Sequence, residues 1–300
     1  MFDWNDLRYF LAVAREGSMV AAAKVLGVNQ STVQRRLGAL ELAIGRALVE
    51  RSTNGYVLTD HGQRLVSHAQ QMEAVAGDFQ RRVNALDDSA AGQVKVASLV
   101  TVGQRIIKSG FIDRFQERHP GIQVEMVLGQ RVVDLARGEA DVAIRGGAPG
   151  SDSLIGKKIA DLPWAIFASK DYVERHGRPS GPSDLVRHKV IELVDEIEQL
   201  PAARWLRSRA PRAQVAARCS NIPSAHLAVK SGAGIAALPY VYANADKDLV
   251  CVLGPIPELN YPMYLLVHKD MRKVRRVSAF FEYCARELKP VLATGKMKDP

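Results

Sequence analysis

The chain has 300 residues, of which 47% are hydrophobic and 24% are charged. These values lie within the range of globular proteins, which excludes a disordered, collagenous or low-complexity chain, and the length predicts about two domains. The 41 Lys and Arg residues outnumber the 32 Asp and Glu residues, and the formal charge of +9 permits a polyanionic partner such as nucleic acid, or an anionic ligand.

The cysteines and the N-terminus bear on the compartment. The three cysteines are Cys219, Cys251 and Cys284. They stand more than 30 residues apart, which excludes a CxxC-type metal site and predicts a reducing compartment. Asp3 and Asp6 lie where a signal peptide carries positive charge, and the longest apolar run, Ala233 to Val241, is far shorter than the roughly 20 residues that span a bilayer. We therefore expect a soluble, cytoplasmic protein with no membrane partner, metal or cofactor.

The charge is distributed unevenly along the chain. Residues 1–91 hold ten basic and ten acidic groups, so residues 92–300 carry the whole excess. Much of it comes from Arg204 to Arg218, with five arginines and no acid, and from the tail after Val267. Net charge alone therefore does not locate a DNA-binding surface.

Three short helices are predicted at the N-terminus. Apolar residues at helical spacing predict a first helix over about Asn5 to Glu16, which Gly17 ends. Ser18 is suited to cap a second helix, which Gly27 stops, and Asn29 is suited to cap a third. The buried stripe of the third helix consists of Val33, Leu37, Leu40 and Ile44. Two short helices joined by a tight, glycine-containing turn predict a helix-turn-helix.

The third helix carries polar or small residues opposite its buried stripe. The first turn of a recognition helix enters the major groove, where amides pair with adenine edges and arginine reaches phosphate or guanine. We therefore predict that this region contacts DNA. The candidate residues are Ser18, Asn29, Gln30, Ser31, Thr32, Gln34, Arg35 and Arg36. The alternative is a solvated polar face on an ordinary helical bundle.

A β-hairpin is predicted over Leu48 to Leu58, because Asn54-Gly55 lies between β-prone residues. In a winged helix such a hairpin lies along the DNA backbone or minor groove, which gives Arg51 and Thr53 a role in contacting phosphate. The alternative is a solvent-exposed turn.

A long helix that starts at Thr59 or Asp60 is predicted next. The residues that recur every seven positions are Leu65, Met72, Phe79 and Leu86, followed four positions later by Ala69, Ala76 and Val83. Such a heptad pattern favours pairing with another chain, and packing against the same chain is the alternative. We favour pairing, because two recognition helices about 34 Å apart read a near-palindrome.

A set of residues at fixed spacing matches a known pattern. The set is Gly17-Ser18, Ala22-Ala23, Leu26, Gln30, Val33, Arg35, Leu40-Glu41, Gly45, Leu48, Arg51, Leu58-Thr59 and Gly62. Together these residues resemble the LysR-type transcriptional regulators, densely over residues 5–65 and in element order through about residue 290. The resemblance implies a winged helix-turn-helix, a linker helix that dimerises, and an effector domain similar to periplasmic binding proteins. Ser31, Gln34 and Val49 depart from the usual Pro, Ser and Phe, so no base preference is carried over.

Beyond the small polar break at 87–92, strand-like and helix-like segments alternate, which predicts a parallel sheet with helices on both faces. The first unit has strands at 94–97, 122–128 and 141–145 and helices at 102–118 and 132–137. The second has a strand at 164–168, a helix at 222–231 and a strand at 235–238, and the chain returns through a strand at 263–267 and a helix at 274–288.

The predicted architecture is therefore α/β with an α-helical head. The winged helix-turn-helix covers 1–58, the linker helix covers 59–88 and the effector domain covers 92–300. Lobe I of the effector domain is about 92–162 and 267–300, and lobe II is about 163–266.

The predicted cleft between the lobes is suited to an anion. In open parallel sheets, ligands bind at the carboxyl ends of strands, beside helix N-termini whose free amides favour negative charge. The candidate residues are Ser98, Val100, Thr101, Gln130, Arg145, Asn221 and Ser224. These positions also match those that line the inducer cleft of LysR-type regulators. The alternative is ordinary N-capping and strand-end polarity.

Two other classes of protein are alternatives to a regulator. A hydrolase or metalloenzyme is not indicated, because the chain contains no GxSxG or HExxH, and Gly232-Ala-Gly enters a strand whereas a phosphate loop enters a helix. A redox sensor at Cys219 is a minor alternative. The second class is a small-molecule-binding protein whose head serves only in dimerisation. Arg35, Arg36, Arg51 and the exposed amides argue against it.

The sequence therefore predicts a non-enzymatic, sequence-specific transcriptional regulator with no catalytic residues. Its expected partners are near-palindromic double-stranded DNA, a small anionic effector and copies of itself in a dimer or tetramer, with RNA polymerase as a further candidate.

Overall fold

The computed structural model describes residues 1–53, 55–86 and 90–294. The chain divides into two compact units, Met1–Gln80 and Arg81–Pro300, and each is described by itself. Within the described ranges, no helix combines the length and the apolar character that crossing a membrane requires.

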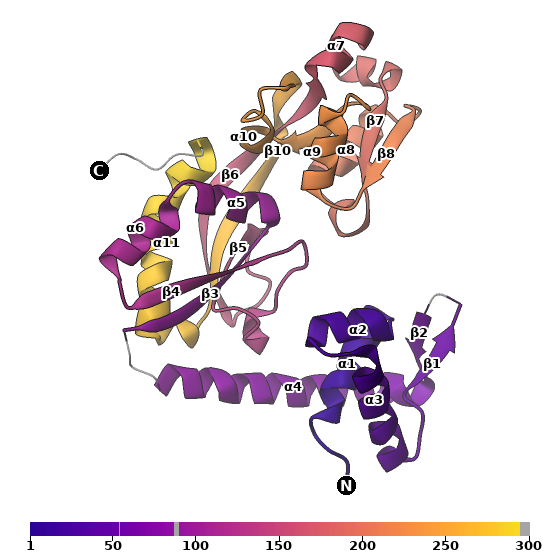
Figure 1. Cartoon of the computed structure of the whole chain (residues 1–300), viewed down its shortest axis with the longest axis vertical. Coiled ribbons are helices and arrows are strands. Elements are labelled where there is room, and N and C mark those ends of the chain that lie inside the picture. Colours follow the sequence, from indigo (N-terminus) through magenta and orange to yellow (C-terminus); the bar gives the residue numbers. More distant parts are fainter. Residues whose placement is uncertain (54, 87–89, 295–300) are drawn as a thin grey trace. The chain divides into compact units, whose positions relative to one another are not determined.

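The first unit begins with three helices around a small core (Figure 1). They are α1 (Asp6–Glu16), α2 (Met19–Leu26) and α3 (Gln30–Ile44). Phe10 and Val13 of α1, Ala22 of α2 and Val33 and Leu40 of α3 are fully buried. This arrangement confirms the predicted helices and the buried stripe of the third helix. The small side chain of Ala22 lets α2 approach its neighbouring helices closely.

A hairpin follows, formed by β1 (Val49–Ser52) and β2 (Gly55–Leu58). The hairpin is confirmed, but its register differs from the expected Asn-Gly turn: Ser52 pairs with Gly55, so Gly55 is a strand residue and Asn54 lies outside the described residues. Gly55 is required for a different reason. A Cβ there would lie 2.3 Å from the carbonyl oxygen of Gly17, which also accepts a hydrogen bond of 2.7 Å from the Tyr56 amide. The wing is thereby packed against the end of α1.

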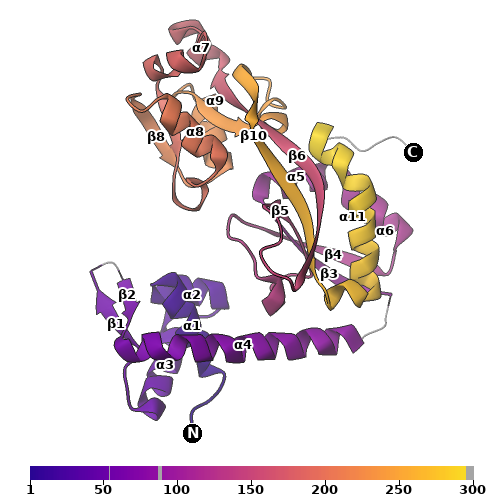
Figure 2. The same cartoon turned by 180° about the vertical axis from the view of Figure 1, so that it is seen from behind.

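The unit ends within α4 (Asp60–Leu86), a helix of 27 residues that confirms the predicted long helix and whose last residues belong to the second unit (Figures 1 and 2). One face of α4 joins the head: Ala69 is buried in the head core, and Arg15 of α1 forms an ion pair with Glu73. Ala69 therefore belongs to the head core and is not available for pairing with another chain.

The second unit has two lobes, and its main sheet has the strand order β4-β3-β5-β10-β6-β9. Lobe I holds β3 (Gly92–Ser98), α5 (Val100–Lys108), α6 (Phe111–Arg118), β4 (Ile122–Leu128), η1 (Leu135–Arg137) and β5 (Val142–Gly146), together with η4 (Met271–Lys273) and α11 (Arg275–Thr294). The strands β3, β4 and β5 are parallel, as predicted, but β10 runs antiparallel to β5 because it enters from lobe II.

The predicted single helix over 102–118 is two helices. Gly110 separates α5 from α6, and its φ of 71° lies in the left-handed region that a continuing α-helix cannot use. The break turns α6 so that Phe111 and Phe115 are buried against Tyr283 of α11. The predicted helix at 132–137 is shorter as well and forms only the 3-10 turn η1.

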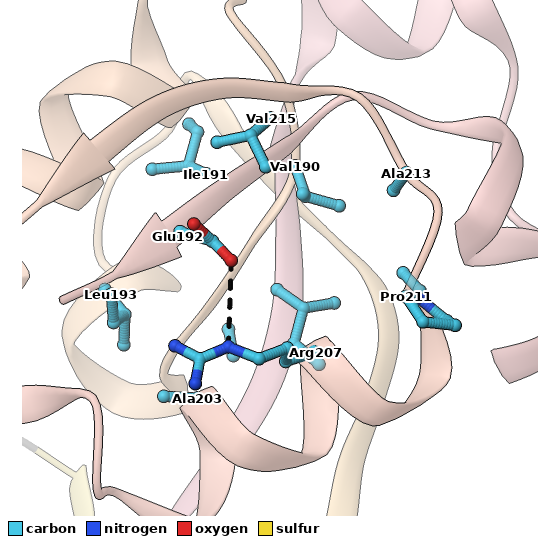
Figure 3. Close-up of a pocket in the computed structure, with 12 residues that line it drawn as sticks. Val190, Ile191, Glu192, Leu193, Ala203, Arg207, Pro211, Ala213 and Val215 are labelled. Carbon is cyan, nitrogen blue, oxygen red and sulfur yellow. Dashed lines mark ion pairs between the residues drawn. The ribbon is translucent and has the colours of Figure 1, made fainter.

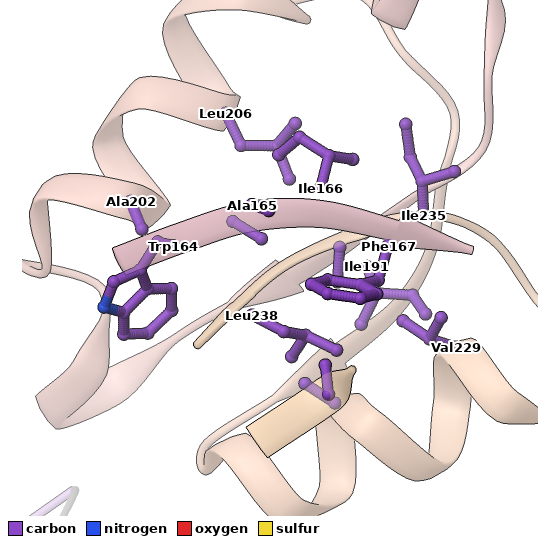
Figure 4. Close-up of a cluster of buried hydrophobic side chains, with 14 of the residues drawn as sticks. Trp164, Ala165, Ile166, Phe167, Ile191, Ala202, Leu206, Val229, Ile235 and Leu238 are labelled. Carbon is purple, nitrogen blue, oxygen red and sulfur yellow. The ribbon is translucent and has the colours of Figure 1, made fainter. Parts of the chain in front are cut away.

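Lobe II is built around the far ends of two long strands, β6 (Leu154–Ser169) and β10 (Leu249–His268). Its other elements are α7 (Lys170–His176), η2 (Pro182–Arg187), β7 (Val190–Leu193), η3 (Asp195–Ile197), α8 (Pro201–Arg209), β8 (Val215–Cys219), α9 (Ile222–Lys230), β9 (Ala236–Pro239) and α10 (Tyr240–Ala243). Figure 4 shows its core, in which Ile166 and Phe167 of β6 lie among side chains from α8, α9 and β7.

The two long strands cross between the lobes side by side (Figures 1 and 2). Along β6 the buried core changes from lobe I to lobe II between Leu162 and Trp164. Along β10 it changes back between Leu259 and Met263, so Met263 and Leu265, which we assigned to lobe II by sequence, pack in lobe I. Tyr261 packs against both cores, which makes it the side chain at the crossover.

Candidate functional site

The face of α3 opposite the head core is exposed and polar. Gln30, Ser31, Gln34 and Arg35 are exposed, and Thr32 is half-buried. Asn29 begins the helix, but its side chain makes no capping hydrogen bond. Among the described residues, the structure gives no ion pair to Arg35, so its guanidinium is available to phosphate or to a base edge.

Two predicted DNA-binding residues have contacts within the head. Ser18 caps α2, since its hydroxyl accepts a hydrogen bond of 3.4 Å from the Ala21 amide. Nη1 of Arg36 lies 3.1 Å from Oδ2 of Asp3 and 3.2 Å from Oδ1 of Asp6. Arg36 therefore links α3 to the start of α1, and its charge is already compensated.

The wing presents Arg51 and Thr53, both exposed, while Asn54 lies outside the described residues. The position of the wing relative to α3 depends on Glu41, whose Oε1 accepts hydrogen bonds from the amides of Leu48 at 2.7 Å and Val49 at 3.2 Å. We did not predict this role for Glu41. The sequence feature that could have identified this role is the presence of Glu41, directly after Leu40, among the residues shared with the LysR-type regulators.

Several acidic groups of the head have partners within it. Asp3 and Asp6 bind Arg36, Glu73 binds Arg15, and Glu41 binds the wing amides. A segment with equal numbers of basic and acidic groups can therefore expose arginines on α3 and the wing while four of its carboxylates are engaged elsewhere, although Glu16, Glu50 and Asp60 are exposed.

A second face of α4 is apolar and exposed. Val75 is 69% exposed, Phe79 68% and Leu65 37%. Met72, Val75 and Phe79 line a groove together with Trp4 from the N-terminal segment. The side chain of Leu86 lies outside the described residues. Three of the four predicted heptad residues thus lie along a face that the described head leaves open.

In lobe I, the junction of β3 and α5 holds the first candidate effector residues. Ser98 and Thr101 are buried and Val100 is half-buried. The Ser98 hydroxyl oxygen has no hydrogen-bond partner among the described residues, and the N-cap of α5 is Leu99, which has no polar side chain to satisfy the first amides. Unsatisfied donors at the start of a helix favour an anion.

Thr101 also faces lobe II. Together with Val102 and Arg105 it lines a narrow crevice whose other wall includes Pro239 and Tyr242. We did not predict a role for Arg105. Burial lowers the pKa of its guanidinium. Its Nη1 donates a hydrogen bond of 2.6 Å to the carbonyl oxygen of Leu292, near the end of α11. The sequence feature that could have identified Arg105 is its position about one helical turn after Thr101.

Gln130 and Arg145 lie at the same end of the sheet. Gln130 is half-buried, two residues beyond Leu128, which pairs with Ser98. Arg145 is half-buried, and its Nε atom is buried without a hydrogen-bond partner among the described residues. Because Ser98 pairs with Ile144, the alternation of a strand directs Arg145 to the opposite face of the sheet from Ser98.

In lobe II, Asn221 caps α9. Its Oδ1 accepts hydrogen bonds of 2.8 Å from both the amide and the hydroxyl of Ser224. These contacts are the N-capping that we set out as the alternative to ligand binding. Asn221 is half-buried and Ser224 is exposed.

The cysteine thiols and the possible metal ligands do not form a further site among the described residues. Burial raises the pKa of the thiols of Cys219 and Cys251 and raises that of Cys284 well above its ordinary value, which keeps the thiols protonated and unreactive. Among the described residues, His, Cys, Asp and Glu side chains form no group of three or more suited to a metal ion.

Comparisons with known proteins agree for both parts of the chain. A family model described as the LysR substrate binding domain matches residues 87–289, and one described as a bacterial regulatory helix-turn-helix protein of the lysR family matches residues 4–63. The probable HTH-type transcriptional regulator LtrA of Klebsiella pneumoniae is 29% identical over 302 residues, which cover 97% of this chain and 96% of that protein. An HTH-type transcriptional regulator of Xanthomonas campestris is 33% identical over 191 residues, which cover 64% of this chain and about half, 55%, of that protein.

Solved structures share the fold over nearly the whole chain. Full-length AphB, a virulence activator of Vibrio cholerae, has a TM-score of 0.60 at 21% identity, covering 94% of this chain and 98% of that one. Full-length CbnR in complex with its target DNA has a TM-score of 0.53 at 22% identity, covering 95% and 99%.

Proposed function

The chain belongs to the LysR family of DNA-binding transcriptional regulators, and from this premise we propose that two copies of its head bind a near-palindromic operator under the control of a small anionic effector. The observation that carries the proposal is the exposed polar face of α3 beside a fixed wing. In this proposal the head covers 1–58, the linker helix 59–88 and the effector domain 92–300.

Within the head, the DNA contacts fall into two groups. Gln30, Ser31 and Gln34 face outward at the start of α3, where amides and hydroxyls reach base edges. Arg35, Arg51 and Thr53 supply phosphate contacts, which position the head without reading sequence. Arg36 forms ion pairs with Asp3 and Asp6. We therefore propose that Arg36 stabilises the head, in place of the direct DNA contact that we predicted.

The apolar face of α4 supports pairing of two copies through Leu65, Met72 and Phe79. Two heads held by paired helices engage two half-sites about one helical turn of DNA apart, which a single head cannot do. Further pairing of dimers would give a tetramer, and RNA polymerase is a further partner in this proposal. The complex acts in the cytoplasm, where the operator DNA is, and performs no catalysis.

Control is exerted at the junction of β3 and α5. An anionic effector there would accept hydrogen bonds from the free amides of α5 and from the Ser98 hydroxyl, which has no other partner among the described residues. Thr101 faces the crevice between the lobes, so a ligand beside it contacts both. The ligand changes DNA binding only if it binds one arrangement of the lobes better than the other.

A gel-shift titration tests the central claim. DNA from beside the chain's own coding region is titrated with the full-length protein at several salt concentrations, with a shuffled sequence as control. We expect preference for one fragment and a steep fall in affinity as salt rises. Equal binding of both sequences would contradict sequence-specific regulation, and binding that ignores salt would contradict the arginine contacts.

A further inference from the structure

Lobe II contains a small apolar cavity that the proposed function does not use (Figure 3). Its volume is about 60 Å³. Ile191 and Leu193 of β7, Leu206 and Ala203 of α8 and Val215 of β8 contribute its walls. None of these residues lines the crevice beside Thr101, so the cavity is separate from the proposed effector site.

The rim of this cavity carries an unbalanced set of charges. Glu192 of β7 and Arg207 of α8 both line it, and in Figure 3 the guanidinium of Arg207 faces the carboxylate of Glu192. A second arginine, Arg218 of β8, also pairs with Glu192. Arg207, which lines the cavity, and Arg218, which does not, therefore share the carboxylate of Glu192, and this leaves one positive charge in excess around it.

The two arginines are held differently. Nε of Arg218 donates a hydrogen bond of 3.0 Å to Oε2 of Glu192. Nε of Arg207 lies 3.7 Å from Oε1 of Glu192, which is beyond hydrogen-bond distance. Arg207 can turn to another anion while Glu192 keeps Arg218 as its partner. A guanidinium offers five N–H donors, and it pairs with a carboxylate through two parallel hydrogen bonds.

We propose that this cavity is a second ligand site, specific for a short-chain aliphatic carboxylate. The apolar tail enters the cavity between β7 and α8, and the carboxylate binds Arg207 at the rim. A volume of 60 Å³ is well above the roughly 10–15 Å³ that a single water molecule needs, so the cavity has room for a short tail of roughly two or three carbon atoms. This site would also give a role to the arginine-rich stretch from Arg204 to Arg218, which DNA binding leaves unexplained.

Butyrate is the probe of choice, because its tail has three carbons beyond the carboxylate. We would titrate it into the full-length protein by isothermal calorimetry and follow the methyl resonances of Ile191 and Leu206 by NMR. Acetate, whose tail is a single methyl group, and butanol, which lacks the charge, should each bind at least tenfold more weakly than butyrate. Arg207→Gln should weaken butyrate binding about tenfold or more, since a hydrogen bond to a charged group is lost.

Matched variants separate this site from its surroundings. Arg204→Gln removes an exposed charge one turn earlier on α8 and should leave butyrate binding unchanged. Ala203→Leu fills the cavity and should abolish binding; its fold is checked by circular dichroism, and if it does not fold, the exposed Arg207→Gln carries the test. The proposal is overturned if butyrate leaves the Ile191 and Leu206 methyl resonances unmoved, if Arg207→Gln binds as the wild type does, or if Thr101→Val, in the crevice, removes the binding.

Discussion

Oε1 of Glu41, near the end of α3, lies 2.7 Å from the amide nitrogen of Leu48, at the entrance to the wing. The same oxygen accepts a second hydrogen bond from Val49. A single carboxylate therefore fixes α3 and the wing, the two parts of the head that we propose face DNA, relative to each other. On the other side of the wing, the Tyr56 amide is bonded to the Gly17 carbonyl, so the hairpin is held from both strands.

Glu41→Ala should lower the free energy of unfolding of the head by about 1–3 kcal/mol, because two partly buried amides lose their acceptor. Operator affinity should fall as well, since the wing loses its fixed position. Glu41→Gln keeps an acceptor oxygen and should cost less. Urea denaturation and gel shifts measure both effects. Glu50→Ala, an exposed glutamate on β1, is the control, and equal stability of the two alanine variants would rule out the role of Glu41.

Arg35 and Arg36 are neighbours that should respond in different ways to the same substitution. Arg35→Ala should weaken operator binding about tenfold and reduce the slope of log affinity against log salt by about 1, because a phosphate or base contact is lost. Arg36→Ala should instead lower the free energy of unfolding by about 1–2 kcal/mol, because the buried Asp6 loses its partner. Gel shifts over a salt series and urea denaturation distinguish the two. A loss of dimer in Arg35→Ala, seen by light scattering, would make Arg35 a structural residue.

The sequence predicts best those features that depend on residues a few positions apart in the chain. The helices α1 to α4 and the strand β4 follow from apolar periodicity and capping residues, which act within a few positions. The helix break at Gly110 was missed, because a glycine inside a helical pattern is tolerated unless packing selects the left-handed conformation, as the burial of Phe111 and Phe115 does here.

The site residues were harder to predict, for a physical reason. Exposure of Gln34 and Arg35 follows from the helical wheel, which needs only the buried stripe of α3. The engagement of Arg36 depends on Asp3 and Asp6, some 30 residues away, and the direction of Arg145 depends on strand register. Contacts of that kind are set by the fold as a whole, so composition and spacing do not reveal them.

Phe79→Glu should convert the dimer to monomers, because it places a charge in the apolar face of α4 that we propose is buried between two copies. The free energy of unfolding of the head should change by less than about 0.5 kcal/mol, since Phe79 is 68% exposed in one chain. Light scattering reports the mass. Ala74→Glu is the control, as Ala74 is exposed on another face of the same helix. A Phe79→Glu protein that stays dimeric would refute pairing through this face.

Ser98→Ala should weaken the response to the ligand without lowering the free energy of unfolding. The Ser98 hydroxyl is buried with no partner among the described residues, so its removal should leave the free energy of unfolding unchanged or raise it by up to about 1 kcal/mol. The same change should weaken the response to the organic acid that most stabilises the wild type in a thermal-shift screen. Thr101→Val should have a similar effect on that response. If both variants keep the wild-type response, the effector does not bind at the start of α5.

Asp246, in the connection between α10 and β10, should make the stability of lobe II sensitive to acid. Burial alone would raise the pKa of its carboxyl, but the Asp248 amide, Lys230 and His226 together lower that pKa to about 2. Oδ2 of Asp246 lies 2.9 Å from both Lys230 Nζ and His226 Nε2. A carboxyl whose pKa is lower in the folded than in the unfolded chain stabilises the fold above its unfolded pKa of about 4, and the stabilisation is lost as pH falls towards about 2.

Asp246→Asn should therefore be less stable than the wild type by about 1 kcal/mol at neutral pH, the value being modest because solvent screens a cluster of partly exposed charges. The difference should be constant above about pH 5 and shrink between about pH 4 and pH 2, since protonation then removes the same charge from the wild type. Urea denaturation at each pH measures it, with the exposed Asp152→Asn as the control. A difference that persists unchanged at pH 2 would mean that the asparagine acts through packing, and that the charge of Asp246 contributes nothing to the fold.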